Sequence, residues 1–422
     1  MKEIVLLKNI TKLTGANLLG QLISILVMPI ITRLHNPASL GEYQFFTTIA
    51  LLLAPFISGS FGMAIINSSS KEIAINNLKV GIRYSVYTTL FFLTITPILI
   101  YFLNNSKLDW FSYYLPLLVL FVFFSVNFQF IISYLNNEKK YEVITKMTFE
   151  KSVVSNFLKV FFSIINKTAI SLTIALIVTE IFQIYKFIKK NNIKKIISMS
   201  NNRFLKELKR NKNYPIHYTG YSVVSILMNW FPVLITGYYY GAHYAGILGL
   251  SLMVVNTPIY PIISTLQNIC FGELSRVDSV ADYLIVYKKI FFIALVPAVA
   301  GIVFLFLYGE TIFGLFFGKI WSEAGLYAAI SYIPISICLI FSPIYSHLCL
   351  KMKIQNIFLG VNILIFIFSL ISFMIISFSD LGFIYFVISC ALFMALNHTI
   401  LFVISMIYFF KNRKVEVIYE GQ

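Results

Sequence analysis

Twelve long apolar runs divide this sequence, and a soluble fold has no interior large enough to bury them. The chain is 59% hydrophobic and only 12% charged, and its mean hydropathy is +0.83. A transmembrane helix needs roughly 20 mostly apolar residues, and bilayer hydrocarbon leaves an open backbone no partner for its polar groups. We therefore predict twelve transmembrane helices, at residues 13–33, 42–66, 81–103, 111–136, 143–165, 168–188, 216–240, 244–272, 289–308, 326–350, 357–379 and 382–410.

Lys and Arg residues alternate between rich and poor in the gaps between these runs. Of the 33 basic residues, 24 fall in the termini and in every second gap, and four fall in the other gaps. Short loops rich in Lys and Arg stay on the cytoplasmic side of a membrane. The alternation therefore predicts a multi-pass protein with both termini in the cytoplasm. Arg33 and Lys289, at the ends of their spans, are counted with the adjoining gaps. Five basic residues remain inside the predicted spans: Arg83, Lys146, Lys151, Lys159 and Lys186.

The net charge of +16 would suggest a nucleic-acid partner in a soluble protein. Here the excess lies in loops that face anionic lipid headgroups, so we expect membrane lipids and no nucleic acid as partners. The four cysteines lie in apolar runs, without the CxxC or histidine spacing of a metal site. No phosphate-binding loop of the Walker type is present. We therefore expect no metal, no cofactor and no ATPase.

A long basic gap at 189–214 separates six predicted spans from six others. The expected domains are an N-terminal six-helix bundle at 1–188, a basic cytoplasmic linker at 189–214 and a C-terminal six-helix bundle at 215–422. Within the linker, Phe204, Leu205 and Leu208 alternate with basic residues, which is typical of a short helix lying at the membrane surface. A solvated basic linker is the alternative.

The two halves repeat each other weakly. Thr14-Gly15 opens the first span and Thr219-Gly220 opens the seventh, an offset of about 205 residues. Gly41 and Gly246 begin the following spans with the same offset. Six spans are an even number, so both halves would have the same orientation, as in transporters built from parallel repeats.

Polar side chains form a stripe along one side of the fifth predicted span, opposite Phe149, Phe157 and Phe161. At 100° per residue, seven polar positions share that side. Charged residues in a membrane are costly unless they face protein or a water-filled cavity, so this stripe marks a candidate site. Its members are Thr145, Thr148, Lys151, Ser152, Ser155, Asn156 and Lys159.

Two lysines of the stripe lie at different depths. At 1.5 Å per residue, Lys151 is about 12 Å and Lys159 about 24 Å from the cytoplasmic end of the span. Two cations along a polar surface suggest a route for an anion. The alternative is ion pairing, because Glu180 of the next span lies at nearly the depth of Lys151. Lys159 has no acid at its own depth, which makes it the better candidate.

Other ionisable residues give weaker signals. Arg83 lies near a cytoplasmic end, where its guanidinium could bind a diphosphate or reach the membrane surface. Glu180 is a candidate for coupling transport to protons. His217, His347 and His398 could titrate near neutrality, although packed and hydrogen-bonded histidines are more common. Lys146 and Glu150 have the spacing of a structural ion pair within one helix.

The segment 15–43 resembles the O-antigen and polysaccharide flippases of the multidrug/oligosaccharidyl-lipid/polysaccharide exporter superfamily. These proteins commonly carry the pattern P-x-x-T-R-L-x-x-P-x-x-x-G-x-Y, matched here by Pro29, Thr32, Arg33, Leu34, Pro37, Gly41 and Tyr43. The resemblance implies two six-helix bundles in a V around a central, often cationic cavity. It also implies that an undecaprenyl-diphosphate-linked oligosaccharide crosses the bacterial inner membrane by alternating access.

Taken with the stripe, this resemblance predicts that Lys159, Lys151 and Arg83 neutralise a diphosphate, with Ser155 and Asn156 beside them. It also implies polysaccharide-assembly proteins, such as a polymerase or a chain-length regulator, as partners. The alternatives are a cation-coupled multidrug exporter or a lipid II flippase of the same superfamily. A membrane polymerase or ligase would need a large outward loop with catalytic Arg or His residues. The longest outward loop expected here, 309–325, has neither.

Overall fold

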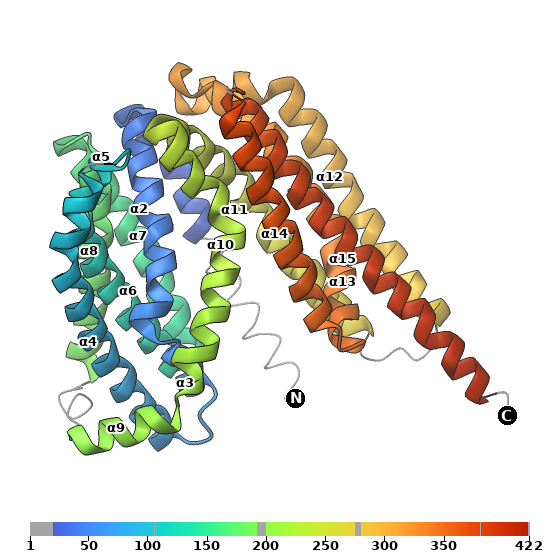
Figure 1. Ribbon diagram of the computed structural model, residues 1–422, viewed down its shortest axis with the longest axis horizontal. Coiled ribbons are helices and arrows are strands. Elements are labelled where there is room, and N and C mark those ends of the chain that lie inside the picture. Colours follow the sequence, from blue (N-terminus) through green and yellow to red (C-terminus); the bar gives the residue numbers. More distant parts are fainter. Residues whose placement is uncertain (1–19, 105, 192–199, 275–279, 380, 421–422) are drawn as a thin grey trace. The chain divides into compact units, whose positions relative to one another are not determined.

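Most of the described part of the chain is helical, with short turns between the helices, and it contains no strand (Figure 1). The computed structural model describes all residues except 1–19, 105, 192–199, 275–279, 380 and 421–422. In this part of the chain, 9 helical stretches are long and apolar enough to cross a membrane, and Gly20–Leu34 is a shorter apolar helix. The predicted all-α membrane fold is confirmed. The Thr14-Gly15 half of the first repeat match lies outside the described residues.

The elements after helix Gly20–Leu34 follow one another with short connections. They are α2 (Pro37–Ser58), α3 (Phe61–Ile66), α4 (Lys71–Leu103), α5 (Asp109–Ser112), α6 (Leu115–Asn137), α7 (Tyr141–Ile165), α8 (Ala169–Asn191), α9 (Asn201–Arg210), the π-helical turn η2 (Tyr214–Tyr218), α10 (Thr219–Ile235), η3 (Thr236–Tyr240), α11 (Gly241–Leu274), α12 (Val280–Phe317), η4 (Lys319–Trp321), α13 (Glu323–Lys351), α14 (Gln355–Phe378) and α15 (Phe383–Glu420).

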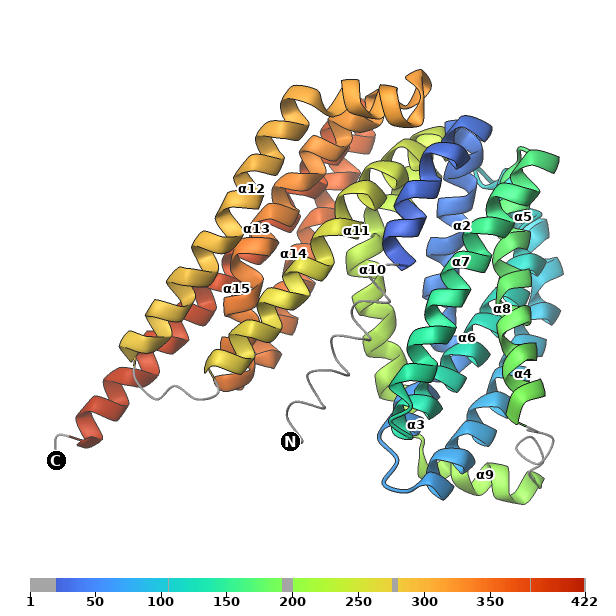
Figure 2. The ribbon, with the colours of Figure 1, turned by 180° about the vertical axis from the view of Figure 1, so that it is seen from behind.

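Contacts divide the chain into two compact units, Met1–Gly246 and Ile247–Gln422. In the first unit α6 packs against α2, α4, α7 and α8, and these helices run side by side in both ribbon views (Figures 1 and 2). Its core includes the fully buried Phe46, Phe61 and Phe130. In the second unit α13 is the central helix, between α12 and α15. The predicted domains 1–188 and 215–422 stay a prediction.

Two predicted segments differ from the observed ones. The span predicted at 42–66 is interrupted, because Gly59 and Ser60 both adopt left-handed backbone angles (φ 52° at each) and separate α2 from α3. The outward loop predicted at 309–325 is mostly helix. The apolar Phe313, Leu315 and Phe316 continue α12 past Glu310, so that only a short segment, including η4, joins it to α13.

The glycines that the sequence paired by their common offset, Gly41 and Gly246, lie directly against each other in the first unit. A Cβ atom on Gly41 would meet the carbonyl oxygen of Ala242 and lie 2.7 Å from the backbone nitrogen of Gly246. A Cβ atom on Gly246 would meet the carbonyl oxygen of Pro37 and lie 2.8 Å from the nitrogen of Gly41. The contact is reciprocal, as expected where two equivalent segments meet about a two-fold axis.

We expect Gly41→Ala to destabilise the protein by about 1–3 kcal/mol, because the new methyl group would meet backbone atoms that cannot rotate away. Thermal unfolding in detergent measures the effect, with the buried thiols of residues such as Cys270 reporting the transition to a thiol-reactive dye. Gly220→Ala is the matched control, since a Cβ there meets nothing within 4 Å. Equal unfolding midpoints for both variants would show that the contact between Gly41 and Gly246 tolerates a side chain.

Candidate functional site

The polar stripe of α7 faces other helices of the first unit. On the opposite side of α7, the side chains of Phe157 and Phe161 are 67% and 48% exposed. On the stripe, Ser155 and Asn156 are buried. The helix therefore has the orientation that its pattern predicted, with aromatic side chains outward and polar side chains toward the protein.

The central part of the stripe forms a hydrogen-bonded contact with helix Gly20–Leu34. The Ser152 hydroxyl donates to the Gly20 carbonyl at 2.7 Å, and the Asn156 amide donates to the Ser24 hydroxyl at 3.0 Å. Gly20 permits this approach, because a Cβ there would lie 3.1 Å from the Ser152 Cβ. Hydrogen bonds of this kind hold membrane helices together. Ser152 and Asn156 thus position the first helix.

Lys151 forms an ion pair, which is the alternative that its sequence position left open. Its Nζ lies 2.6 Å from Glu180 Oε1 on α8 and 4.3 Å from the centroid of the Phe128 ring on α6. The Lys151 side chain is 31% exposed and that of Glu180 only 3%. The pair therefore fastens α7 to α8, with one edge of the lysine left accessible.

The carboxylate of Glu180 is incompletely satisfied. Its Oε2 atom is buried and has no hydrogen-bond partner among the described residues, and the same holds for both amide atoms of Gln183, one helical turn away. Buried polar atoms without partners are uncommon and costly. The α7–α8 contact thus has room for additional hydrogen bonding beside the Lys151–Glu180 pair.

Lys159 has a different environment from Lys151, although both belong to the same stripe. Its Nζ lies 5.3 Å from the centroid of the Tyr43 ring on α2, and the residue is partly exposed. It makes no ion pair within the part of the chain that the structure describes. Lys159 is about 12 Å further along the helix axis than Lys151. Lys159 is therefore a cation that lies near an aromatic ring and has no ion pair among the described residues.

Arg83 lies on α4 and contacts α9. Its guanidinium hydrogen-bonds to the hydroxyl of Tyr87 at 2.9 Å and to the side-chain oxygen of Asn201. It also lies 5.1 Å from the centroid of the Phe204 ring. The structure therefore places Arg83 against α9, whereas Lys151 and Lys159 contact α6, α8 and α2.

Two further expectations concern ionisable residues outside the stripe. Glu150 pairs with Lys186 of α8 at 2.5 Å, so the expected pairing with Lys146 on the same helix is wrong. His347 and His398 each hydrogen-bond a tyrosine, Tyr287 at 3.2 Å and Tyr345 at 3.0 Å. The side chain of His217 lies outside the described residues.

The pattern that carried the resemblance has a structural basis in these contacts. Pro37 is the first residue of α2, and Asn36 caps that helix by accepting from the Ser39 amide at 2.8 Å. Gly41 makes the close crossing with Gly246, and Tyr43 supplies the ring beneath Lys159. Tyr43 was missed as a site residue, because the helical pattern of α7 alone does not show which side chains of α2 approach it.

The whole fold is similar to solved structures of MOP-superfamily transporters. An inward-facing multidrug resistance MATE family transporter has a TM-score of 0.65 at 14% identity, over 93% of this chain and 96% of that chain. An outward-facing MATE family transporter has a TM-score of 0.52 at 14% identity, covering 98% and 97%. A MOP-superfamily transporter from Pyrococcus furiosus, described by the reverse polarity of its binding pocket, has a TM-score of 0.54 at 14% identity, covering 95% of each chain.

No curated protein sequence matches the chain. Residues 30–325, well over half of the sequence, match the family described as polysaccharide biosynthesis protein. The match includes the quoted pattern from Thr32 to Tyr43, α7 with Lys151 and Lys159, and α8 with Glu180. The chain belongs to the polysaccharide biosynthesis protein family and has the fold of MOP-superfamily transporters.

Proposed function

We propose that this protein is a flippase that moves an oligosaccharide linked to undecaprenyl diphosphate across the bacterial inner membrane by alternating access. An O-antigen unit or a related polysaccharide repeat unit is the proposed cargo. Its diphosphate and sugars cannot cross hydrocarbon unaided, whereas its lipid tail can remain in the bilayer. The family description and the transporter fold support export of a polysaccharide precursor. The proposed topology places both termini in the cytoplasm.

The observation that carries this proposal is the available cation of Lys159. A lysine inside a membrane span costs up to about 2.5–3.5 kcal/mol on insertion scales, with the largest cost at the helix centre, and an anionic ligand would offset part of that cost. Among the described residues Lys159 has an aromatic neighbour and no ion pair. Its environment therefore suits the phosphate of a passing ligand better than a permanent internal pair.

Lys151, Arg83, Ser155 and Asn156 are proposed to have supporting roles. Lys151 keeps part of its side chain exposed while paired with Glu180, so a phosphate could share its charge. Arg83 would attract an anion near the cytoplasmic end. Ser155 and Asn156 are buried, and they would act by positioning α7. Glu180, whose second oxygen lacks a partner in the described structure, is the proposed proton-coupling group. A polymerase and a chain-length regulator are proposed partners.

A cation-coupled multidrug exporter is the second candidate, because two of the similar folds belong to multidrug resistance transporters. Such a protein would hold a cationic drug with an accessible acid. In the described part of α7 and α8, Glu150 and Glu180 already face lysines at 2.5 Å and 2.6 Å. This balance of charge favours an anionic cargo.

Purified protein in vesicles should transfer a fluorescent undecaprenyl-diphosphate oligosaccharide between leaflets. The fraction bleached by a membrane-impermeant reductant measures the transfer, since only labels in the outer leaflet react. We expect that fraction to rise from about half to nearly all of the label, because a flippase gives both leaflets access. Protein-free vesicles are the control. A bleached fraction equal to that of the control would contradict the flippase proposal, and transport of a cationic dye instead would favour the exporter.

In the same vesicles, Lys159→Ala should lower the initial rate by about 10–100-fold, because one charge-assisted contact contributes about 1.5–3 kcal/mol. Lys159→Arg should retain most of the rate, since the charge is kept. Lys146→Ala is the matched control on the same helix, because it removes an equal charge from an exposed position. Full activity of Lys159→Ala at equal reconstitution would remove Lys159 from the transport path.

Lys151→Met should destabilise the protein, because the Glu180 carboxylate would stay buried without its partner. We expect a loss of about 1–3 kcal/mol, below the usual effect of breaking a buried pair because Lys151 is partly exposed. The double variant Lys151→Met/Glu180→Leu should recover most of that stability. Thermal unfolding in detergent tests the coupling. Additive losses in the double variant would show that the two side chains do not stabilise each other.

A further inference from the structure

Helix α9 lies across one end of the helices of the first unit, against the end of α4, in both ribbon views (Figures 1 and 2). This confirms that the basic segment before α10 contains a helix. One face of α9 is firmly attached. Phe204 is buried, packs edge-on against Tyr87 at 5.7 Å between ring centroids, and lies under the Arg83 guanidinium.

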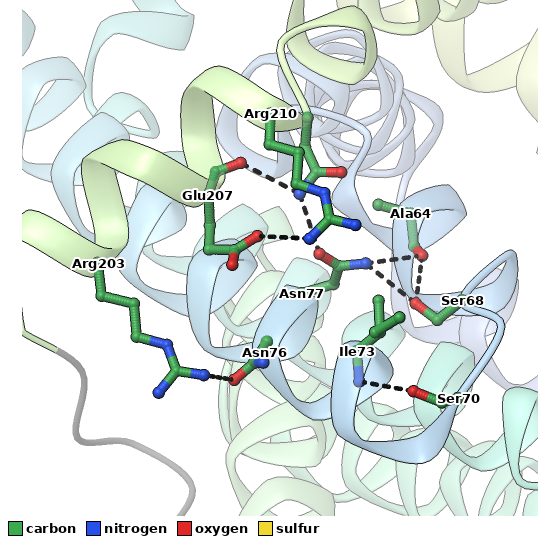
Figure 3. Close-up of polar contacts among 10 residues, drawn as sticks. Ala64, Ser68, Ser70, Ile73, Asn76, Asn77, Arg203, Glu207 and Arg210 are labelled. Atoms are coloured by element: carbon green, nitrogen blue, oxygen red, sulfur yellow. Dashed lines mark hydrogen bonds and ion pairs between the residues drawn. The ribbon is translucent and has the colours of Figure 1, made fainter.

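Polar contacts fix both ends of α9 to the first turns of α4 (Figure 3). Arg203 donates to the side-chain oxygen of Asn76 at 3.1 Å, and Asn211, just after the helix, donates to that of Asn77 at 3.0 Å. Asn77 in turn donates to the Ala64 carbonyl at 3.1 Å. The orientation of α9 is thereby determined, and so is the face that it presents outward.

The outward face of α9 is strongly cationic. Lys206, Lys209 and Arg210 are exposed, and the one acid of the helix, Glu207, lies 3.9 Å from Arg210. Lys206 and Lys209 make no ion pair among the described residues. At 100° per residue, both lysines point away from Phe204. The side chains of Lys206 and Lys209 therefore do not help to hold α9 against α4.

Apolar side chains lie exposed next to this cationic face. Leu205 is 54% exposed and separates Phe204 from Lys206. On α4, Tyr87 beside Phe204 is 49% exposed, and Leu90 and Phe91 on the next turn are 55% and 59% exposed. Lysines on a helix that crosses the ends of spanning helices therefore lie close to exposed apolar residues of α9 and α4. This arrangement matches the boundary between headgroups and hydrocarbon.

We propose that α9 is a binding site for anionic phospholipid headgroups. The phosphates contact Lys206 and Lys209, and the acyl chains lie along the apolar outer face of α4 near Tyr87. Charge complementarity and the neighbouring apolar surface favour a lipid over a soluble acidic ligand, which would have no use for exposed Leu90 and Phe91. Because α9 holds Asn201 against Arg83, bound lipid stabilises this end of the first unit.

The test compares protein in lipid nanodiscs of phosphatidylcholine alone with protein in nanodiscs that also contain phosphatidylglycerol. Phosphatidylglycerol should raise the thermal unfolding midpoint of the unmodified protein, and its retention on the protein can be measured by native mass spectrometry. Lys206→Gln/Lys209→Gln should weaken phosphatidylglycerol retention by about thirty-fold, since each lysine near an anionic surface contributes about a factor of five. Lys206→Arg/Lys209→Arg should behave like the unmodified protein.

Lys288→Gln/Lys289→Gln is the matched control, because it removes two exposed adjacent lysines from α12. It should leave phosphatidylglycerol retention within about two-fold of the unmodified protein, given the scatter of surface charge effects. Equal unfolding midpoints in phosphatidylcholine alone would show that the α9 variant folds. The proposal is overturned if the α9 variant keeps its response to phosphatidylglycerol, or if the α12 variant loses it equally. Leaflet transfer is a separate measurement, so failure here leaves the flippase proposal standing.

Discussion

The backbone contact between α2 and α11 at Gly41 and Gly246 constrains the elements that form the candidate site. Each glycine faces backbone atoms of the other helix, so neither position has space for one more carbon. Helix α2 begins at Pro37, only four residues before Gly41. The contact between Gly41 and Gly246 therefore also determines how the first turns of α2 are rotated about the helix axis. Tyr43 follows Gly41 by two residues, and its ring lies below Lys159. A constraint on packing thereby orients a side chain of the site.

The second helix that orients the site is α7, which uses its polar residues for two purposes. Ser152 and Asn156 hydrogen-bond the first helix and thus replace the apolar contact that is usual between spanning helices. Hydrogen bonds between membrane helices contribute about 0.6 kcal/mol on average. Two such bonds and the close approach at Gly20 therefore position helix Gly20–Leu34 against α7, yet they are weak enough to break when the helices move. The stripe is therefore partly a helix contact, and its far end at Lys159 is the part that we propose as a surface for ligands.

Much of this arrangement follows from the sequence, because periodicity and charge act along single helices. The apolar runs predicted the spanning helices, and the 100° repeat predicted which side of α7 is polar. The equal offset of Gly41 and Gly246 indicated equivalent positions in two halves. The sequence could not show that these glycines touch, or that Lys159 lies over Tyr43, because both contacts join separate helices. The interruption at Gly59 and Ser60 was also missed, since left-handed backbone angles at two successive residues leave the hydropathy unchanged.

The two lysines of α7 differ in environment because an acid lies opposite only one of them. Antiparallel packing brings Glu180 of α8 to the depth of Lys151 and Lys186 of α8 to Glu150, so Glu150 and Glu180 each meet a base. Lys159 lies nearer the turn between the two helices and makes no ion pair among the described residues. Pairing the internal charges in this way leaves a positive charge at Lys159. The positive charge of Lys159 would repel a cationic cargo. The same charge would stabilise an anionic cargo that passes close to it.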